Sequence, residues 1–351
     1  MSDGLPRLMG MNNDSYVLVG NSKGGTLTTL RVSGEELTHV GDYAVGEGCS
    51  TFAVDHERGL VYVATKEPKP AIVTLRIDGE RGQHEEISRR EVADPLAYLD
   101  VSPRGHMLLA ASYHGGWGAS YPVTDGVVGE ESARVEGRNM HASLFDPAGH
   151  NAYFVSLGED LIAQFATTSD GGLSELSEPV VRHTPGSGPR HLVFSEDGQH
   201  GYLLTEFTGE AVRYERGGSG RLTRAEEVPA YDLTRGLRTS SYGLDPVEGH
   251  LVWGADLALA GGGRWLVCSE RTESTIGAVA VGADGRLSGP VVITDTEAQP
   301  RGLTVSPDGE HVVVVGEKSG HASLYRIYDD GNLVLQSRIE TGEGPNWVRF
   351  L

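Results

Sequence analysis

Short apolar phrases separated by polar turns recur along the whole chain. Seven of these phrases can be aligned, and they end at Leu30, Leu75, Tyr121, Phe165, Tyr214, Val279 and Tyr325. The steps between these positions are 45, 46, 44, 49, 65 and 46 residues. A repeat of this length that shows strand patterns, and no helix-period segment of useful length, is typical of a β-propeller. The pattern therefore predicts seven blades.

The repeat around residues 143–176 shows how one blade is built. An apolar pair at 144–145 is followed by the turn Asp-Pro-Ala-Gly at 146–149, and then by the continuous apolar run 152–155. A strand that does not alternate suits a sheet that neighbouring blades cover on both faces. A third strand is predicted at 161–166, and a more polar fourth strand from Leu173 suits an outer edge. We therefore expect four-stranded antiparallel blades.

The two ends of the chain complement each other in this scheme. The first repeat, from Tyr16, lacks an innermost strand, and the final apolar segment 346–351 has no blade of its own. We expect the last segment to supply the missing strand and close the ring. The prediction is a single all-β domain over residues 1–351, a seven-bladed propeller. The long step of 65 residues places an insertion at about 215–254, which we expect to lie over the mouth of the ring.

Composition excludes several classes of partner. Lys and Arg number 29 against 49 Asp and Glu, a net charge of −20. Nucleic acids and anionic membranes bind basic patches, so neither is expected as a partner. Cys49 and Cys268 are too few for a disulfide framework, and we expect free thiols. Met1–Arg7 has no apolar segment like that of a signal peptide, and no run approaches the ~18 apolar residues of a membrane span, so we expect a cytoplasmic protein.

Candidate chemistry lies where a propeller exposes its central channel. Residues just before the predicted inner strands, and residues at the ends of the second strands, should converge around the axis. The first group is His141, Arg190, His191, Asp256, Arg301 and Asn346, and the second is Tyr113, His114, Glu206 and Arg271. Arginine binds carboxylate or phosphate through a fixed fork of donors, and His beside Glu can move protons near neutral pH. This combination favours acid–base chemistry on a small anionic molecule.

Less specific interpretations of the same residues remain open. The arginines and carboxylates also suit salt bridges between blades, and His114 also suits a turn. Trp253, Trp265 and Trp347 suit packing. The histidines do not show the spacing of metal ligands. We therefore expect no catalytic metal and no cofactor.

At these residues the chain resembles the seven-bladed lactonase family, which includes propeller-type 6-phosphogluconolactonases and carboxymuconate-lactonizing enzymes. The matching phrases are Ala111–Gly116, His141–Ser143 with Asp146-Pro147, Gly188–Phe194, Thr205-Glu206, Ser269–Arg271, Gln299–Gly302 and Gly344–Val348. The resemblance implies that His141, Arg190, Glu206 and Arg271 line the site, with Gln299 and Arg301 close by. It also implies hydrolysis or formation of a lactone without a required metal.

Three functions are therefore compatible with the sequence. The first is a lactonase acting on an anionic sugar lactone such as 6-phosphogluconolactone, with an arginine holding the oxyanion and Glu206 or His141 activating water. The second is a cycloisomerase acting on a muconate-like dicarboxylate. The third is a non-catalytic propeller that binds a protein partner. For the enzyme we expect a small substrate bearing phosphate or carboxylate, and a monomer or weak homodimer.

Overall fold

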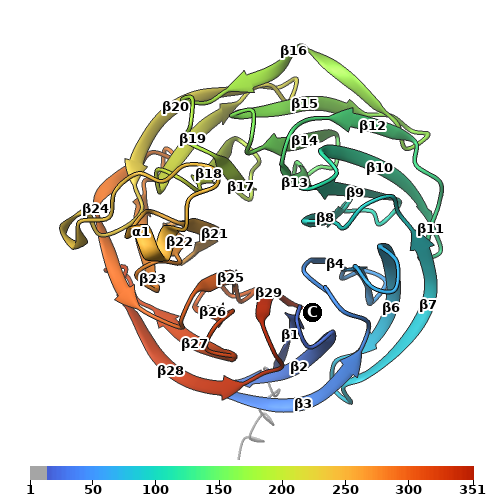
Figure 1. Cartoon of the computed structure of the whole chain (residues 1–351), viewed down its shortest axis with the longest axis horizontal. Coiled ribbons are helices and arrows are strands. Elements are labelled where there is room, and N and C mark those ends of the chain that lie inside the picture. The colour runs from blue at the N-terminus through green and yellow to red at the C-terminus, as the bar shows by residue number, and fades with distance from the viewer. Residues whose placement is uncertain (1–13) are drawn as a thin grey trace, which may run out of the picture.

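Seven antiparallel sheets surround a central axis in the computed structural model, which describes residues 14–351 (Figure 1). Each sheet has four strands, except that the outer strand of the third sheet is split into two short pieces. The predicted seven-bladed all-β propeller is confirmed. The segment Met1–Arg7, which lacks an apolar stretch, lies outside the described residues. No helix within 14–351 is long and apolar enough to cross a membrane.

In each of the first three blades the strands follow one another from the axis outward. Blade 1 consists of β29 (Pro345–Phe350), β1 (Ser15–Asn21), β2 (Thr26–Ser33) and β3 (Glu36–Ala44). Blade 2 consists of β4 (Phe52–Asp55), β5 (Leu60–Thr65), β6 (Ala71–Asp78) and β7 (Gln83–Glu91). Blade 3 consists of β8 (Tyr98–Val101), β9 (Met107–Ser112), β10 (Trp117–Thr124), and the outer pieces β11 (Val127–Val128) and β12 (Ala133–Glu136).

The remaining four blades follow the same order. Blade 4 consists of β13 (Met140–Phe145), β14 (Asn151–Ser156), β15 (Leu161–Thr167) and β16 (Leu173–Arg182). Blade 5 consists of β17 (Pro189–Phe194), β18 (His200–Thr205), β19 (Glu210–Arg216) and β20 (Leu222–Pro229). Blade 6 consists of β21 (Gly254–Ala260), β22 (Trp265–Glu270), β23 (Thr275–Val281) and β24 (Leu287–Asp295). Blade 7 consists of β25 (Pro300–Val305), β26 (His311–Gly316), β27 (His321–Ile327) and β28 (Leu333–Glu340).

The repeated apolar phrases of the sequence are the third strands of the seven blades. Their central residues are buried, because each sheet packs face to face against the blades on either side. The second strands are buried even more completely, and every residue of β5, β9 and β14 is buried. Outer strands such as β20 alternate between exposed residues and residues that are buried or half-buried. Within each repeat, the strands that lie farther from solvent are thus the more apolar ones.

The chain closes its ring as expected, because the C-terminal strand β29 completes the blade that the N-terminal strands begin. β29 pairs antiparallel with β1, so that Val348 lies opposite Val19 and Phe350 opposite Val17. In addition, Trp347 Nε1 donates a hydrogen bond of 2.8 Å to the carbonyl oxygen of Phe52 in blade 2. The last strand therefore holds together both sides of the junction.

The long repeat arises between β20 and β21, where residues 230–253 form an insertion. It contains the short 3-10 helix η1 (Leu233–Arg235) and the single-turn helix α1 (Pro246–Gly249), which Asp245 caps. In Figure 1 the insertion lies over the β21–β22 side of the ring instead of spanning the central opening. Its last residue, Trp253, lines the central pocket. The insertion therefore flanks the mouth on one side.

Because β29 closes the ring, removal of a buried side chain from its packing against β1 should strongly destabilise the protein. Phe350 is 5% exposed, and Phe350→Ala should lower the free energy of unfolding by about 3–5 kcal/mol. Urea unfolding followed by tryptophan fluorescence measures this. The matched change Tyr328→Ala, at an aromatic side chain that is 44% exposed, should stay within about 0.5 kcal/mol of the unsubstituted protein. Equal values for the two variants would contradict a stabilising role for the closing strand.

Candidate active site

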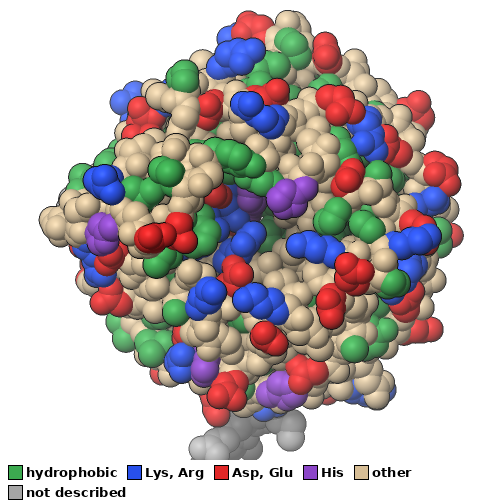
Figure 2. Space-filling view, viewed as in Figure 1, with side chains coloured by type: hydrophobic (Ala, Val, Ile, Leu, Met, Phe, Trp, Pro, Cys, Tyr) green, Lys and Arg blue, Asp and Glu red, His purple; other side chains and the backbone are tan. Residues whose placement is uncertain are grey.

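A cavity of about 820 Å³ opens at the centre of one face of the ring. Figure 2 shows Lys, Arg and His side chains, together with acidic side chains, around this hollow. Eight of the residues predicted from the sequence line it, namely Tyr113, His114, His141, Arg190, Glu206, Arg271, Arg301 and Asn346. They come from six different blades. The ring therefore brings together residues that lie far apart in the sequence.

β-Bulges orient several of these side chains toward the axis of the ring. The inner strands shift register against the second strands at His141, at Arg190, at Arg301 and at Asn346, so each of these is an extra residue without a partner in the ladder. A bulge bends the strand locally and redirects a side chain. The pairing of β4 with β5 in blade 2 has no such shift. Four of the pocket residues thus lie at the same kind of β-bulge at the start of an inner strand.

One carboxylate, whose side chain is 14% exposed, joins two buried arginines. Glu206 Oε2 lies 2.9 Å from Arg190 Nε and 3.1 Å from Arg271 Nη2, and it links blades 5 and 6. The side chains of Arg190 and Arg271 are 2% and 3% exposed. Burial alone would raise the pKa of Glu206, but Arg271, Arg190 and Arg301 together lower it below its ordinary value. The expected salt bridge between blades is present, and it lies in the wall of the pocket.

In each of the two arginines, one terminal guanidinium nitrogen has no hydrogen-bond partner among residues 14–351. Arg190 uses Nε for Glu206 and Nη1 for the carbonyl oxygen of Ala255, at 2.5 Å. Arg271 uses Nη2 for Glu206 and for the carbonyl oxygen of Gly254, and its guanidinium stacks 3.9 Å from the ring centre of Trp253. Within residues 14–351, no hydrogen bond engages Arg190 Nη2 or Arg271 Nη1. Two fixed, charged donors are therefore available in the pocket wall.

A second buried layer supports Arg190 from below. His191 Nδ1 lies 2.8 Å from Asp256 Oδ1, and His191 Nε2 lies 3.0 Å from Arg190 Nη1. Because the Asp256 carboxylate only accepts hydrogen bonds, His191 carries a proton on Nδ1, whereas Arg190 Nη1, 3.3 Å from Nδ1 and 3.0 Å from Nε2, lies over the face of the imidazole ring. Burial, and next the charge of Arg190, lower the pKa of His191 to about 4. The chain from Asp256 through His191 therefore orients the Arg190 guanidinium.

His141 is also held in its neutral form. Its side chain is buried, and its ring makes edge contacts with Tyr113 and His191 at centroid distances of 5.6 and 5.1 Å. Burial, and next the charge of Arg190, lower the pKa of His141 well below its ordinary value. Its Nδ1 has no hydrogen-bond partner among the described residues. His141 is thus an uncharged ring in the pocket lining, near Arg190 and Arg271.

Three predicted residues lie outside the pocket lining. His191 and Asp256 form the buried layer under Arg190, where Asp256 also accepts the backbone N–H of Leu303 at 3.1 Å. Gln299 lies in the turn before β25, with a φ of 55°. Its backbone N–H donates to Ser274 Oγ. The described residues contain no group of three His, Cys, Asp or Glu side chains placed to hold a metal ion.

The pocket also contains charged residues that were not singled out from the sequence. Lys23 and Lys66 line the side formed by blades 1 and 2, and Glu317 pairs with Arg301 at 3.2 Å. Trp253, expected to pack, does so against Arg271 while lining the pocket. The lysines lie in loops, where no repeat pattern marks them. In the sequence, these lysines stand out only because lysine is scarce in a chain that is rich in arginine.

Comparison with known proteins places this architecture among the lactonases. A family model described as lactonase, seven-bladed β-propeller, matches residues 9–350. The 6-phosphogluconolactonase of Serratia proteamaculans is 28% identical over 305 residues, which cover 85% of this chain and 87% of that protein. That of Sodalis glossinidius is 29% identical over 302 residues, covering 84% and 86%.

Solved structures share the fold. The periplasmic gluconolactonase of Pseudomonas aeruginosa superposes with a TM-score of 0.83 at 23% identity, covering 97% of this chain and 99% of that one. A putative 6-phosphogluconolactonase from Bacteroides fragilis superposes with a TM-score of 0.84 at 21% identity, covering 98% and 100%. At these identities the structural likeness supports the propeller architecture.

The buried histidines predict loss of stability in mild acid. The folded-state pKa of His191 is about 4 and that of His183 about 3, against about 6.5 in an unfolded chain. As pH falls from 6.5 towards 4, the unfolded chain therefore binds protons that the folded protein does not, and stability decreases. Urea unfolding at pH 5 should give a free energy lower than at pH 7 by roughly 1–2 kcal/mol for each buried histidine.

The exposed His39 provides the control for this effect. Its side chain is 46% exposed, so His39→Gln should leave the difference between pH 5 and pH 7 unchanged. His183→Gln should reduce that difference. Equal stability of the unsubstituted protein at the two pH values would contradict the neutral state of the buried histidines.

From the hydrogen bonds that Asp256 accepts beneath Arg190, we predict that the isosteric change Asp256→Asn lowers the free energy of unfolding. In Asp256→Asn the amide nitrogen cannot accept a hydrogen bond, so one donor facing this side chain becomes unsatisfied. We expect a loss of about 1–3 kcal/mol in the free energy of unfolding. The same change at the exposed cap Asp245 should cost almost nothing, because Asn caps helices as well as Asp does. Chemical denaturation of both variants measures the difference, and equal stabilities would contradict the assigned network.

Proposed function

This chain belongs to the seven-bladed β-propeller lactonase family, and we propose that it hydrolyses the ester bond of an anionic sugar lactone of the 6-phosphogluconolactone kind. The substrate class is taken from the 6-phosphogluconolactonases to which the chain is similar. The main observation behind the proposal is that two buried arginines, Arg190 and Arg271, each have one guanidinium nitrogen without a hydrogen-bond partner among the described residues. An anionic substrate, a developing oxyanion and a carboxylate product are all groups that such donors bind.

In the proposed reaction the two arginines act on the lactone carbonyl. Arg190 Nη2 and Arg271 Nη1 donate to the carbonyl oxygen and stabilise the negative charge that forms on it when water attacks. Their positions are set in advance by Glu206 and by backbone carbonyl oxygens, so little reorganisation is needed. Charged donors held in a buried wall stabilise an oxyanion far better than water does.

His141 is the proposed base. Its neutral ring takes a proton from the attacking water, whose oxygen forms the new bond to the carbonyl carbon. The ester C–O bond then breaks, the ring oxygen of the sugar takes the proton back from His141 as the hydroxyl forms, and the carboxylic acid releases its remaining proton to solvent to give the carboxylate product. Burial and the neighbouring arginines hold down the pKa of His141. A bound anionic substrate offsets the arginine charge and raises the pKa of His141 towards neutrality, which improves it as a base.

Glu206 is proposed to position the arginines. Its Oε2 is shared by Arg190 and Arg271. Loss of this charge would leave two buried guanidinium groups without a counterion, which opposes burial of the arginines. Arg301, which is 35% exposed and paired with Glu317, lies in the same wall and adds positive potential for the substrate.

The test is hydrolysis of freshly generated 6-phosphogluconolactone, followed by acid release at controlled pH and compared with the spontaneous rate. We expect His141→Gln to lower kcat by about 10²–10⁴-fold, as for loss of a general base. Arg271→Lys should lower kcat by about 10²–10³-fold, because the fixed fork is lost. Melting temperatures of the variants show whether the fold is retained.

Two exposed substitutions serve as controls. Arg76→Met and His39→Gln change side chains that are 59% and 46% exposed, and both should retain full activity. A rate no higher than the spontaneous one on a panel of phosphorylated and unphosphorylated lactones would overturn the proposal. Loss of muconate absorbance in a parallel assay would instead favour the cycloisomerase.

A further inference from the structure

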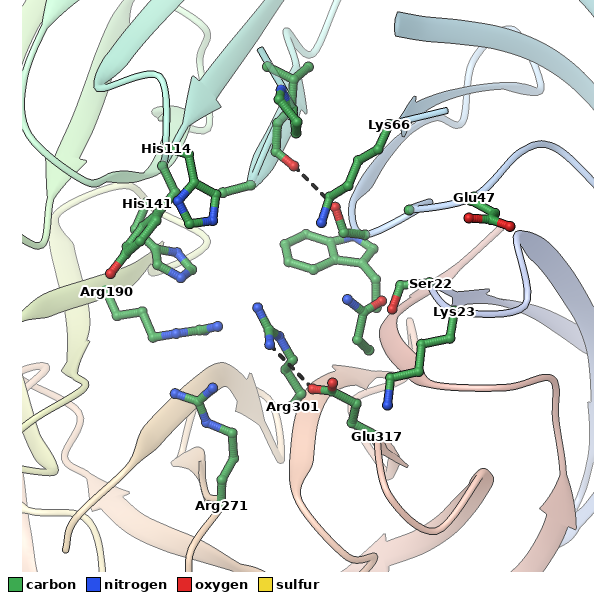
Figure 3. A pocket seen from close by; sticks show the side chains of 18 of the residues that line it. Ser22, Lys23, Glu47, Lys66, His114, His141, Arg190, Arg271, Arg301 and Glu317 are labelled. Carbon is green, nitrogen blue, oxygen red and sulfur yellow. Dashed lines mark hydrogen bonds and ion pairs between the residues drawn. The ribbon is translucent and has the colours of Figure 1, made fainter. Parts of the chain in front are cut away.

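Two lysines enter the central pocket from the side opposite Arg190 and Arg271 (Figure 3). The lysines of the chain are Lys23, Lys66, Lys69 and Lys318, and the first two line the pocket. Lys23 lies in the loop between β1 and β2, and Lys66 in the loop between β5 and β6. The cavity therefore has an arginine side on blades 5 to 7 and a lysine side on blades 1 and 2.

The two sides differ in how their charges are paired. Glu206 neutralises part of the arginine side, and Glu317 pairs with Arg301. No ion pair joins Lys23 or Lys66 to any carboxylate of residues 14–351, although Lys69 outside the pocket pairs with Glu91 at 3.0 Å. Exposed carboxylates of Glu47, Glu67 and Glu343 line the same rim, yet none is within ion-pair distance of these lysines. Both ammonium charges are therefore available to a ligand.

Glycines make room for both lysine stems. Gly48 has a φ of 74°, and a Cβ added there would lie 2.5 Å from Cγ and Cδ of Lys66. Gly344 has a φ of 67°, and a Cβ added there would lie 2.8 Å from Cγ of Lys23. Each lysine thus lies across a glycine from a neighbouring loop, in space that any other residue would fill. This packing directs the lysines along the pocket wall.

The chemistry of the lysine side suits a phosphate monoester. An ammonium group is a compact point charge that binds phosphate oxygens from many directions, whereas the arginine side presents fixed forks suited to a planar carbonyl or carboxylate. In a phosphorylated hexono-1,5-lactone the carbonyl carbon C1 and the carbon C5, which bears the phosphorylated CH2 group, flank the ring oxygen, so the carbonyl oxygen and the phosphate project from the ring in different directions. A molecule of this kind therefore presents two separate acceptor groups, which can contact the arginine side and the lysine side of one pocket.

We propose that Lys23 and Lys66 form a phosphate subsite, which binds the phosphate monoester of the substrate while Arg190 and Arg271 hold its lactone carbonyl. The assignment of the carbonyl end rests on the lactonase activity proposed above. The lysines then determine specificity for phosphorylated over unphosphorylated lactones. They take no part in the bond-breaking step.

The test compares 6-phosphogluconolactone with unphosphorylated glucono-1,5-lactone. We expect the double variant Lys23→Met, Lys66→Met to lower kcat/KM for the phosphorylated lactone by about tenfold for each lysine, mainly through KM. The values for the unphosphorylated lactone should not change. Lys69→Met, outside the pocket, should leave both substrates unaffected.

Gly48→Ala gives an independent arm, because it displaces the Lys66 stem without removing a charge. It should reproduce the KM effect of Lys66→Met while the melting temperature shows that the ring remains folded. Unchanged kinetics with the phosphorylated lactone in the double variant, or an equal loss for both lactones, would overturn the phosphate subsite.

Direct binding separates this inference from the proposed reaction. Titration calorimetry with 6-phosphogluconate should show binding to the unsubstituted protein that is weakened in the double variant, whether or not a lactone is turned over. Hydrolysis of both lactones with equal 6-phosphogluconate affinity in the two proteins would overturn the subsite while leaving the lactonase proposal intact. Weakened binding without any lactone hydrolysis would support the subsite and count against the reaction.

Discussion

Closure of the ring by β29 against β1 is the constraint on which the other features depend. A propeller without that pairing would leave blade 1 without its inner strand and expose an unpaired sheet edge. With it, seven sheets are held around one axis, and the start of every inner strand faces the same opening. Arg190, at the start of the inner strand of blade 5, and Asn346, in the closing strand of blade 1, lie far apart in sequence, yet they line one cavity because the circle is complete.

Within that circle, irregular backbone creates the pocket wall. The bulges at His141, Arg190 and Arg301 interrupt ladders that are otherwise continuous. Each interruption releases one residue from the alternation of the strand, so a polar side chain can turn to the axis while its neighbours stay in the apolar sheet. Burying arginine in this way is costly unless its donors are satisfied. Glu206 and backbone carbonyl oxygens satisfy most of them, and Arg190 Nη2 and Arg271 Nη1 stay without a partner among the described residues.

The pocket is asymmetric in its electrostatics. On blades 5 and 6 Arg190 and Arg271 are buried and paired with Glu206, which suits catalysis by donors whose positions are set in advance. On blades 1 and 2 the charges are unpaired and more exposed, which suits recognition of a solvated anion. The chain as a whole carries a net charge of −20, whereas the pocket lining holds five Lys or Arg and five Glu side chains, so the balance of charge at this mouth is a local property that composition does not reveal.

The sequence alone determined the number of blades, the closing strand and the ring of positions before each inner strand, because strand patterns and turn residues repeat at a regular period. That coordinate system led to His141, Arg190 and Arg301, whereas the grouping of Glu206 with Arg271 also drew on family resemblance. Only the tertiary structure decided which of two adjacent polar residues faces the channel. Arg190 does so and His191 does not, since a bulge shifts the alternation by one residue. The lysine side was also decided there, because the direction of Lys66 depends on a glycine from a different loop, and no local pattern records such a contact.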